Sequence, residues 1–219
     1  CSSDLTDGKK EISTILVPVP TAGFTAEPAY DKVGWNASDT HPLSFDDVRV
    51  PAENLLGDRG RGYANFLRIL DEGRIAIAAL SVGAAQGCVD ESVKYAKERQ
   101  AFGVPIVEHQ AVLFRLADMA TQITVARQMV LHAAALKEAG EPCLTEASMA
   151  KLFASETCGR VVDRCVQVYG GAGYLAEYPA ERFFRDARIL RIYEGTSQIM
   201  QLQIAKHLLR EFAREGAVW

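Results

Sequence analysis

An acidic residue, Glu194, stands between apolar and aromatic neighbours near the C-terminal end of the sequence. Gly195 and Thr196, which follow it, are residue types that can start a helix. A carboxylate that is kept from water has a raised pKa and becomes a usable base near neutral pH, whereas a helix N-terminus favours the anion and opposes this effect. The segment therefore leaves two interpretations open: a general base, or an ordinary acidic residue at the start of a helix.

A glycine-rich segment, residues 171–176, fits the G-x-G-x-x-A pattern of dinucleotide-binding folds, and Glu194 lies about 20 residues further on. In those folds the pattern follows a strand and opens a helix, whereas here it follows a long helical pattern. We therefore expect these glycines to permit close approach of the backbone, either to another helix or to a ligand. The spacing leaves both possibilities open.

Metal binding is disfavoured by the placement of the histidines. Helical bundles often hold di-iron centres through Glu-x-x-His pairs. No histidine in the sequence has a glutamate three residues before it; the four are His41, His109, His132 and His207. We expect no metal site.

The composition is that of a globular protein, with 48% hydrophobic and 24% charged residues in 219. The net charge of −4 argues against nucleic acid as a partner, and no apolar run approaches the roughly 18 residues of a membrane span. The five cysteines are an odd set without a C-x-x-C pair, which indicates reduced intracellular thiols. Cys158 and Cys165 are spaced to share a helix face, and we expect both to be buried.

The first part of the chain has the character of short strands. Residues 12–19 are β-branched and closed by prolines, and residues 45–51 alternate like an edge strand. Strands this short need partners to cover their edges. Residues 1–57 therefore look like the tail of a β domain.

After Gly62 the apolar residues recur at helical spacing, which predicts a mainly α chain with an up-and-down helical bundle over residues 58–219. The predicted helices cover about residues 66–87, His109 to Gly140, Thr145 (as N-cap) to Gly170, 180–190, and 199–212.

Four segments of the chain resemble the acyl-CoA dehydrogenase family, in that family's order and approximate spacing. They are residues 70–74 (LDEGR), 98–103 (ERQAFG), 167–174 (QVYGGAGY) and 191–198 (RIYEGTSQ). The resemblance implies that residues 1–57 are the end of a β-barrel-like middle domain and that residues 58–219 are the C-terminal helical domain. The family's N-terminal domain has no counterpart here, so we expect a truncated form that alone binds FAD poorly and turns over slowly or not at all.

This family oxidises an acyl-CoA thioester to the trans-2-enoyl-CoA: a carboxylate takes the α-proton while a hydride passes from Cβ to N5 of FAD. The resemblance implies that Glu194 is that base. Some members place the base directly before the arginine that Arg74 matches, but this position is Gly73 here, which favours Glu194. Among the members of this family, the motifs are most similar to those of the short-chain and short/branched-chain enzymes.

The resemblance also implies the remaining site residues and partners. Residues matching FAD contacts are Arg99, Gln110, Gln167, Val168, Tyr169, Gly170, Gly171, Thr196 and Gln198. Residues matching the acyl-CoA site are Tyr63, Asp71, Arg74 and Gly195. Because the family's flavin is shared between protomers, we expect a dimer or tetramer, with an electron-transfer flavoprotein as electron acceptor, in bacterial cytoplasm or mitochondrial matrix.

Two alternatives remain. The first is a related acyl-CoA oxidase or flavin monooxygenase built on the same fold. The monooxygenases have no need of a base at Glu194, so this residue counts against them. The oxidases differ chiefly in admitting oxygen to the reduced flavin. The chain could instead be a helical oligomerisation module without catalysis, in which case Glu194→Gln would leave activity intact.

Overall fold

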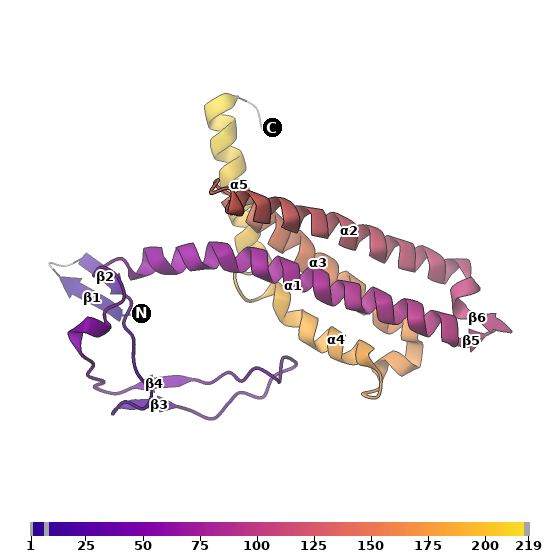
Figure 1. Cartoon of the computed structure of the whole chain (residues 1–219), viewed down its shortest axis with the longest axis horizontal. Helices are drawn as coiled ribbons and strands as arrows, with labels where there is room; N and C mark the ends of the chain where they lie inside the picture. The colour runs from indigo at the N-terminus through magenta and orange to yellow at the C-terminus, as the bar shows by residue number, and fades with distance from the viewer. Residues whose placement is uncertain (1, 7–8, 217–219) are drawn as a thin grey trace. The chain divides into compact units, whose positions relative to one another are not determined.

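The computed structural model of the chain describes residues 2–6 and 9–216 (Figure 1). The chain divides into two compact units, residues 1–70 and 71–219, which are described separately below. No helix in these described ranges is long and apolar enough to cross a membrane.

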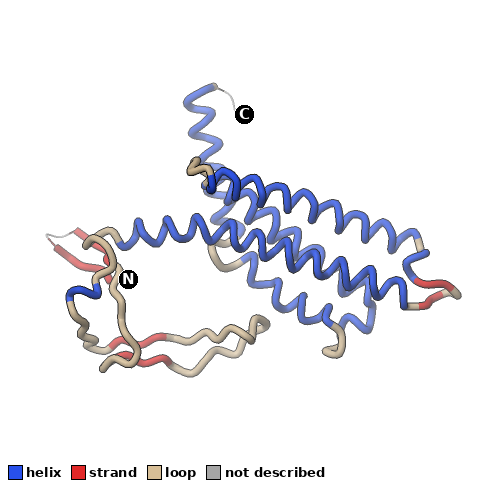
Figure 2. The backbone as a smooth tube through the Cα atoms, in the orientation of Figure 1, coloured by secondary structure: helices blue, strands red, loops and turns tan. Residues whose placement is uncertain are grey.

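The first unit contains two pairs of antiparallel strands, drawn in red in Figure 2. Its elements are β1 (Ser2–Thr6) paired with β2 (Lys9–Ser13), β3 (Phe24–Ala26) paired with β4 (Leu43–Phe45), the 3-10 turn η1 (Ala52–Asn54), and the start of helix α1 (Gly62–Glu98). Gly62 lies so close to β2 that an added Cβ would be 2.7 Å from the backbone of Ser13. The β-rich character expected of this part is confirmed.

The two strands predicted within this unit are placed wrongly. In the predicted 12–19 strand, β2 ends at Ser13, and Ile15 makes only an isolated bridge with Leu55. Beyond that bridge, Pro18 and Pro20 have no N–H to donate to a ladder, so the strand does not resume. In the predicted 45–51 strand, β4 ends at Phe45 because Asp47 turns the chain with a φ of 44°.

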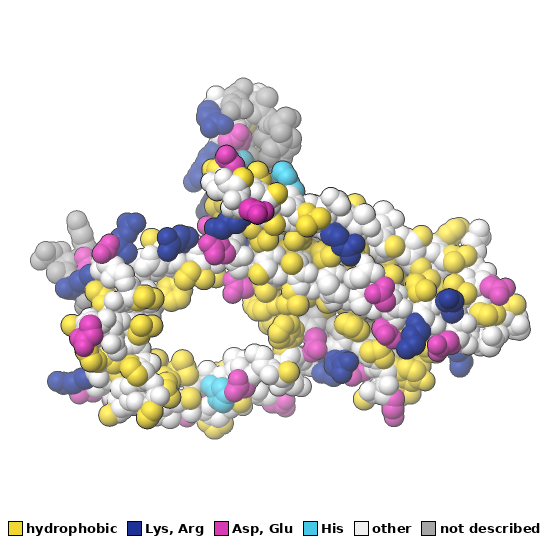
Figure 3. Space-filling view, in the orientation of Figure 1, with side chains coloured by type: hydrophobic (Ala, Val, Ile, Leu, Met, Phe, Trp, Pro, Cys, Tyr) yellow, Lys and Arg dark blue, Asp and Glu magenta, His cyan; other side chains and the backbone are white. Residues whose placement is uncertain are grey.

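The second unit is a helical bundle joined by short turns, as the sequence predicts (Figures 1 and 2). The rest of α1 is followed by β5 (Gln100–Ala101), β6 (Val104–Pro105), η2 (Ile106–Glu108), α2 (Gln110–Glu138), α3 (Leu144–Tyr169), η3 (Gly170–Tyr174), α4 (Pro179–Ala187), η4 (Arg188–Arg191) and α5 (Ser197–Glu215). Helix α3 packs against α2, α4 and α5. Lys, Arg, Asp and Glu side chains are interspersed over the visible face of these helices (Figure 3).

The helix ends agree with the sequence except at the end of α1, which runs to Glu98 rather than to about residue 87, and at the start of α3. Gly140 follows α2 and Gly170 follows α3 with φ of 73° and 60°, the left-handed region that glycine enters without strain. Thr145 is not the N-cap of α3: Ala147 N donates to Cys143 O at 2.8 Å, so the helix already begins at Leu144. Thr145 lies inside the first turn and its side chain is buried.

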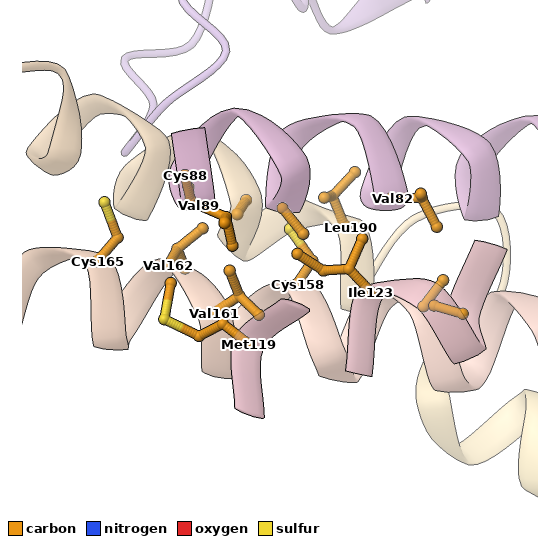
Figure 4. Close-up of a cluster of buried hydrophobic side chains, with 14 of the residues drawn as sticks. Val82, Cys88, Val89, Met119, Ile123, Cys158, Val161, Val162, Cys165 and Leu190 are labelled. Carbon is orange, nitrogen blue, oxygen red and sulfur yellow. The ribbon is translucent and has the colours of Figure 1, made fainter. Parts of the chain in front are cut away.

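The core of the bundle is built from small and medium side chains of α1, α2 and α3 (Figure 4). Met119 and Ile123 of α2 meet Val161 of α3 there, and alanines fill many of the remaining positions. Cys158 and Cys165 are both fully buried, which confirms that prediction. Burial raises the pKa of the Cys158 thiol to about 12.

Thiol labelling tests this packing. Of the four cysteines in the described part of the chain, Cys143 is half-buried, whereas Cys88, Cys158 and Cys165 are fully buried. We expect N-ethylmaleimide at neutral pH to modify Cys143 at least about 100-fold faster than the other three, which react only when the bundle opens. Peptide mass spectrometry measures the rates. Native-state labelling of Cys158 as fast as that of Cys143 would contradict the packing.

Candidate active site

Glu194 lies in a tight turn between η4 and α5. Its φ is 53° and that of Gly195 is 96°, so two successive residues are left-handed. For a residue with a side chain this conformation costs about 1–2 kcal/mol, so the surroundings must hold it. Thr196 ends the turn as N-cap of α5, and its Oγ1 accepts a hydrogen bond from Ile199 N at 3.3 Å. The predicted helix start at this threonine is confirmed.

The carboxylate of Glu194 lies against the backbone of α1 at Gly73. A Cβ on residue 73 would be 2.4 Å from Oε2 of Glu194 and 3.1 Å from its Cδ. These separations are shorter than real Cβ contacts, so the glycine leaves the space that the carboxylate occupies. The motif on α1 and the motif after η4 therefore meet at one point.

Arg74, the residue after this glycine, is buried, with 5% exposure. Its guanidinium donates from one terminal nitrogen to Asp71 Oδ1 at 2.9 Å. Its Nε has no hydrogen-bond partner among the described residues. A buried donor without a partner costs free energy, so this nitrogen is available to a ligand.

Helix α3 holds both sides of the turn. Lys151 is fully buried, and its Nζ donates to Gly195 O at 2.6 Å. Five residues further along α3, Glu156 accepts from Ser197 Oγ at 2.6 Å and from Arg191 at 3.4 Å. These contacts tie the segment on each side of Glu194 to a helix of the core.

The charges around Lys151 have opposing effects on the pKa of its ammonium group. Burial lowers the pKa of Lys151, the charges of Glu156 and Glu194 raise it, and that of Arg74 lowers it further. Burial also raises the pKa of Tyr193, with a further contribution from Glu194. Glu194, Lys151 and Arg74 thus belong to one electrostatic cluster.

Most of the residues that match FAD contacts of the family lie away from Glu194. Arg99, Gln110 and Gln167 are exposed, and Gln167 lines an open groove between α2 and α3. At about 1.5 Å per residue, Gln167 lies about 24 Å along α3 from Lys151. The structure therefore separates this group from Glu194 within one chain.

Few side chains of the segment 167–171 are accessible to a ligand. Val168 and Tyr169 are buried, and Tyr169 stacks on Tyr95 with ring centroids 4.1 Å apart while its hydroxyl donates to Glu91 O at 3.2 Å. Burial raises the pKa of Tyr169. Gly170 and Gly171 are exposed, with nothing within 4 Å of an added Cβ. Any contact from this stretch would come from its backbone and from Gln167.

Three further predicted residues take different positions. Thr196 and Gln198 flank the start of α5, the first half-buried and the second exposed, so both lie next to the turn of Glu194. Tyr63 belongs to the first unit and is 60% exposed.

Sequence reasoning missed Lys151 and Glu156. Lysine is rarely fully buried, so it is usually assigned to the surface. A signal was present, because at helical spacing Lys151 shares a face with Ala147, Ala154 and Cys158. The sequence around Glu156 gives no comparable indication of its role.

No group of three or more His, Cys, Asp or Glu side chains within the described ranges is arranged to hold a metal ion.

Comparison with known proteins shows the family to which the chain belongs. The model of the acyl-CoA dehydrogenase C-terminal domain matches residues 60–209. The chain is 52% identical over 204 residues to the probable acyl-CoA dehydrogenase YngJ of Bacillus subtilis, covering 93% of this chain and 54% of that protein. It is 48% identical over 211 residues to the mitochondrial short-chain specific acyl-CoA dehydrogenase of Rattus norvegicus, covering 96% and 51%.

Among solved structures, butyryl-CoA dehydrogenase from Megasphaera elsdenii superposes with a TM-score of 0.89 at 42% identity, covering 91% of this chain and 52% of that one. The chain belongs to the acyl-CoA dehydrogenase family. It spans about half the length of the curated relatives it matches.

Replacing Gly73 by alanine tests the contact with Glu194 in the complete enzyme. The obstructing atom is the end of a flexible side chain, so we expect the carboxylate to move by about 1 Å and kcat to fall about 10- to 100-fold. The melting temperature should stay equal or rise, because alanine is favoured over glycine inside a helix by about 0.5–1 kcal/mol. Steady-state kinetics and thermal unfolding measure the two effects.

Gly83→Ala is the matched control, since Gly83 lies in the same helix and an added Cβ there meets nothing within 4 Å. We expect it to keep full activity. Equal activity of the two variants would contradict the contact.

Proposed function

We propose that this chain is the base-bearing half of an FAD-dependent acyl-CoA dehydrogenase that acts on short-chain acyl-CoA thioesters. The observation that carries the proposal is the Glu194 carboxylate, held on a strained turn against Gly73 and beside Arg74. The short-chain preference is supported by the names of two similar proteins, a short-chain specific and a butyryl-CoA dehydrogenase.

In this proposal Glu194 removes the α-proton of the thioester. That proton is only weakly acidic, so the base must be positioned against it and shielded from water. The chemistry that bound FAD would supply is a hydride acceptor for the hydrogen on Cβ. The electron pair of the broken Cα–H bond would then form the Cα–Cβ double bond. Glu194 ends the step protonated, and the product is the trans-2-enoyl-CoA.

The acyl-CoA site would use the residues around the base. The unpartnered Nε of Arg74 is a donor for a polar group of the thioester substrate, and Asp71 orients that guanidinium. Gly195, directly after the base, brings its backbone close to the ligand. Tyr63 is proposed as a further lining residue of this site.

The residues present fit FAD, in two groups. Arg99, Gln110, Gln167 and the open backbone at Gly170 and Gly171 supply a guanidinium, amides and free approach for a pyrophosphate. Thr196 and Gln198 lie beside the base, at a helix N-terminus that favours anions.

Gln167 of the first group lies about 24 Å along α3 from Lys151, which binds the turn just before the second group. We therefore propose that the two groups serve different flavins. The enzyme would then be a dimer or tetramer in which each flavin is shared between protomers.

Three further proposals follow from the family resemblance. Residues 1–57 would be the end of the middle β domain and residues 58–219 the bundle domain. An electron-transfer flavoprotein would reoxidise the flavin. The buried, unpaired thiols fit a reducing compartment, either bacterial cytoplasm or mitochondrial matrix.

Glu194→Gln in the complete enzyme tests the function. We expect flavin reduction by butyryl-CoA to slow by several orders of magnitude while FAD stays bound, because only the proton acceptor is lost. Anaerobic rapid mixing, followed by flavin absorbance, measures the rate. Full activity of this variant would favour the non-catalytic oligomerisation module, and fast reoxidation of the wild-type flavin by air would favour an oxidase.

A further inference from the structure

Lys151 is a fully buried cation in the core helix α3. Taking an ammonium group out of water is costly unless it is hydrogen-bonded and compensated by opposite charge. Glu156 of α3 and Glu194 of the turn supply the opposite charge, and Arg74 of α1 adds a second positive one. Two buried cations that repel one another are a poor arrangement for stability alone, which points to a role in the site.

The ammonium group of Lys151 donates a hydrogen bond to the backbone and not to the carboxylate of Glu194. Nζ of Lys151 donates to the carbonyl of Gly195, the residue that follows Glu194. A direct bond would occupy carboxylate oxygens that must accept a proton. Binding the carbonyl instead fixes the peptide plane after the base and leaves the carboxylate oxygens available.

The turn needs such an anchor, because its left-handed residues are intrinsically unfavourable. The anchor itself is rigid: Ala150 and Ala154, on either side of Lys151, are buried in the bundle core. Met200 closes the other side, since its Cε would be 2.5 Å from a Cβ on Gly195. The turn is therefore confined between α3 and the first turn of α5.

We propose that Lys151 is a positioning residue of the dehydrogenation: it holds the Gly195 carbonyl, fixes the turn that carries Glu194, and supplies a positive charge near the carboxylate. This inference rests on the proposed function, with Glu194 as base. Lys151 touches neither substrate nor cofactor in this account and acts through the turn.

The test compares variants of the complete, FAD-loaded enzyme with butyryl-CoA as substrate. Lys151→Met keeps the length of the side chain but removes the charge and the donor. We expect kcat for flavin reduction to fall at least about 100-fold, with KM changed less than about threefold, because positioning affects the chemical step more than binding. The acid limb of the kcat–pH profile should move to higher pH, since a nearby positive charge favours the anionic form of a carboxylate.

Two further variants separate the hydrogen bond from the charge. Lys151→Gln keeps a donor without the charge, so it should recover part of kcat while its acid limb stays shifted. It also covers the case in which Lys151→Met fails to fold. Lys94→Met, an exposed lysine on α1, is the matched control and should behave as wild type.

The outcomes distinguish the positioning role from the proposed function. If the Lys151 variants lower only the melting temperature while kcat per bound FAD and the pH profile stay those of wild type, the positioning role is overturned. If Glu194→Gln is active in the same assay, the proposed function fails and the positioning role fails with it. Loss in Glu194→Gln together with the kcat and pH changes in the Lys151 variants supports both.

Discussion

The carboxylate of Glu194 occupies the space that a side chain on residue 73 would fill. This single steric constraint connects two motifs that are far apart in the sequence, and it explains why a glycine precedes Arg74. With a side chain at residue 73, the carboxylate would have to leave this position. Arg74 is the next residue and its guanidinium is buried, so the same turn of α1 supplies the space for the carboxylate and a polar donor.

Helix α3 provides the fixed frame for this arrangement. Its small buried residues let the neighbouring helices pack closely. Buried Lys151 and half-buried Glu156 bind the backbone and side chains on each side of Glu194. The strain of the left-handed turn is thereby compensated by contacts with the most buried helix of the bundle. Further along α3, exposed Gln167 lines an open groove, so the same helix reaches both this groove and the turn of Glu194.

Features that depend on local chemistry could be predicted from the sequence. The helix ends at Gly140 and Gly170 and the cap at Thr196 follow from backbone preferences, and the bundle follows from apolar periodicity. Features that depend on tertiary contacts could not. The start of α3 before Thr145 and the early end of β2 at Ser13 depend on backbone pairing, and the buried site lysine, Lys151, contradicts the usual preference of its residue type.

The most direct test of Glu194 as the base measures exchange of the α-protons of the substrate. Butyryl-CoA is incubated with the complete FAD-loaded enzyme in D2O without an electron acceptor, and deuterium at Cα is measured by mass spectrometry of the recovered thioester. If Glu194 is the base, the wild-type enzyme catalyses exchange at Cα and Glu194→Gln abolishes it. Exchange at the wild-type rate in that variant would mean that another group removes the proton, and would contradict the assignment of Glu194 as the base.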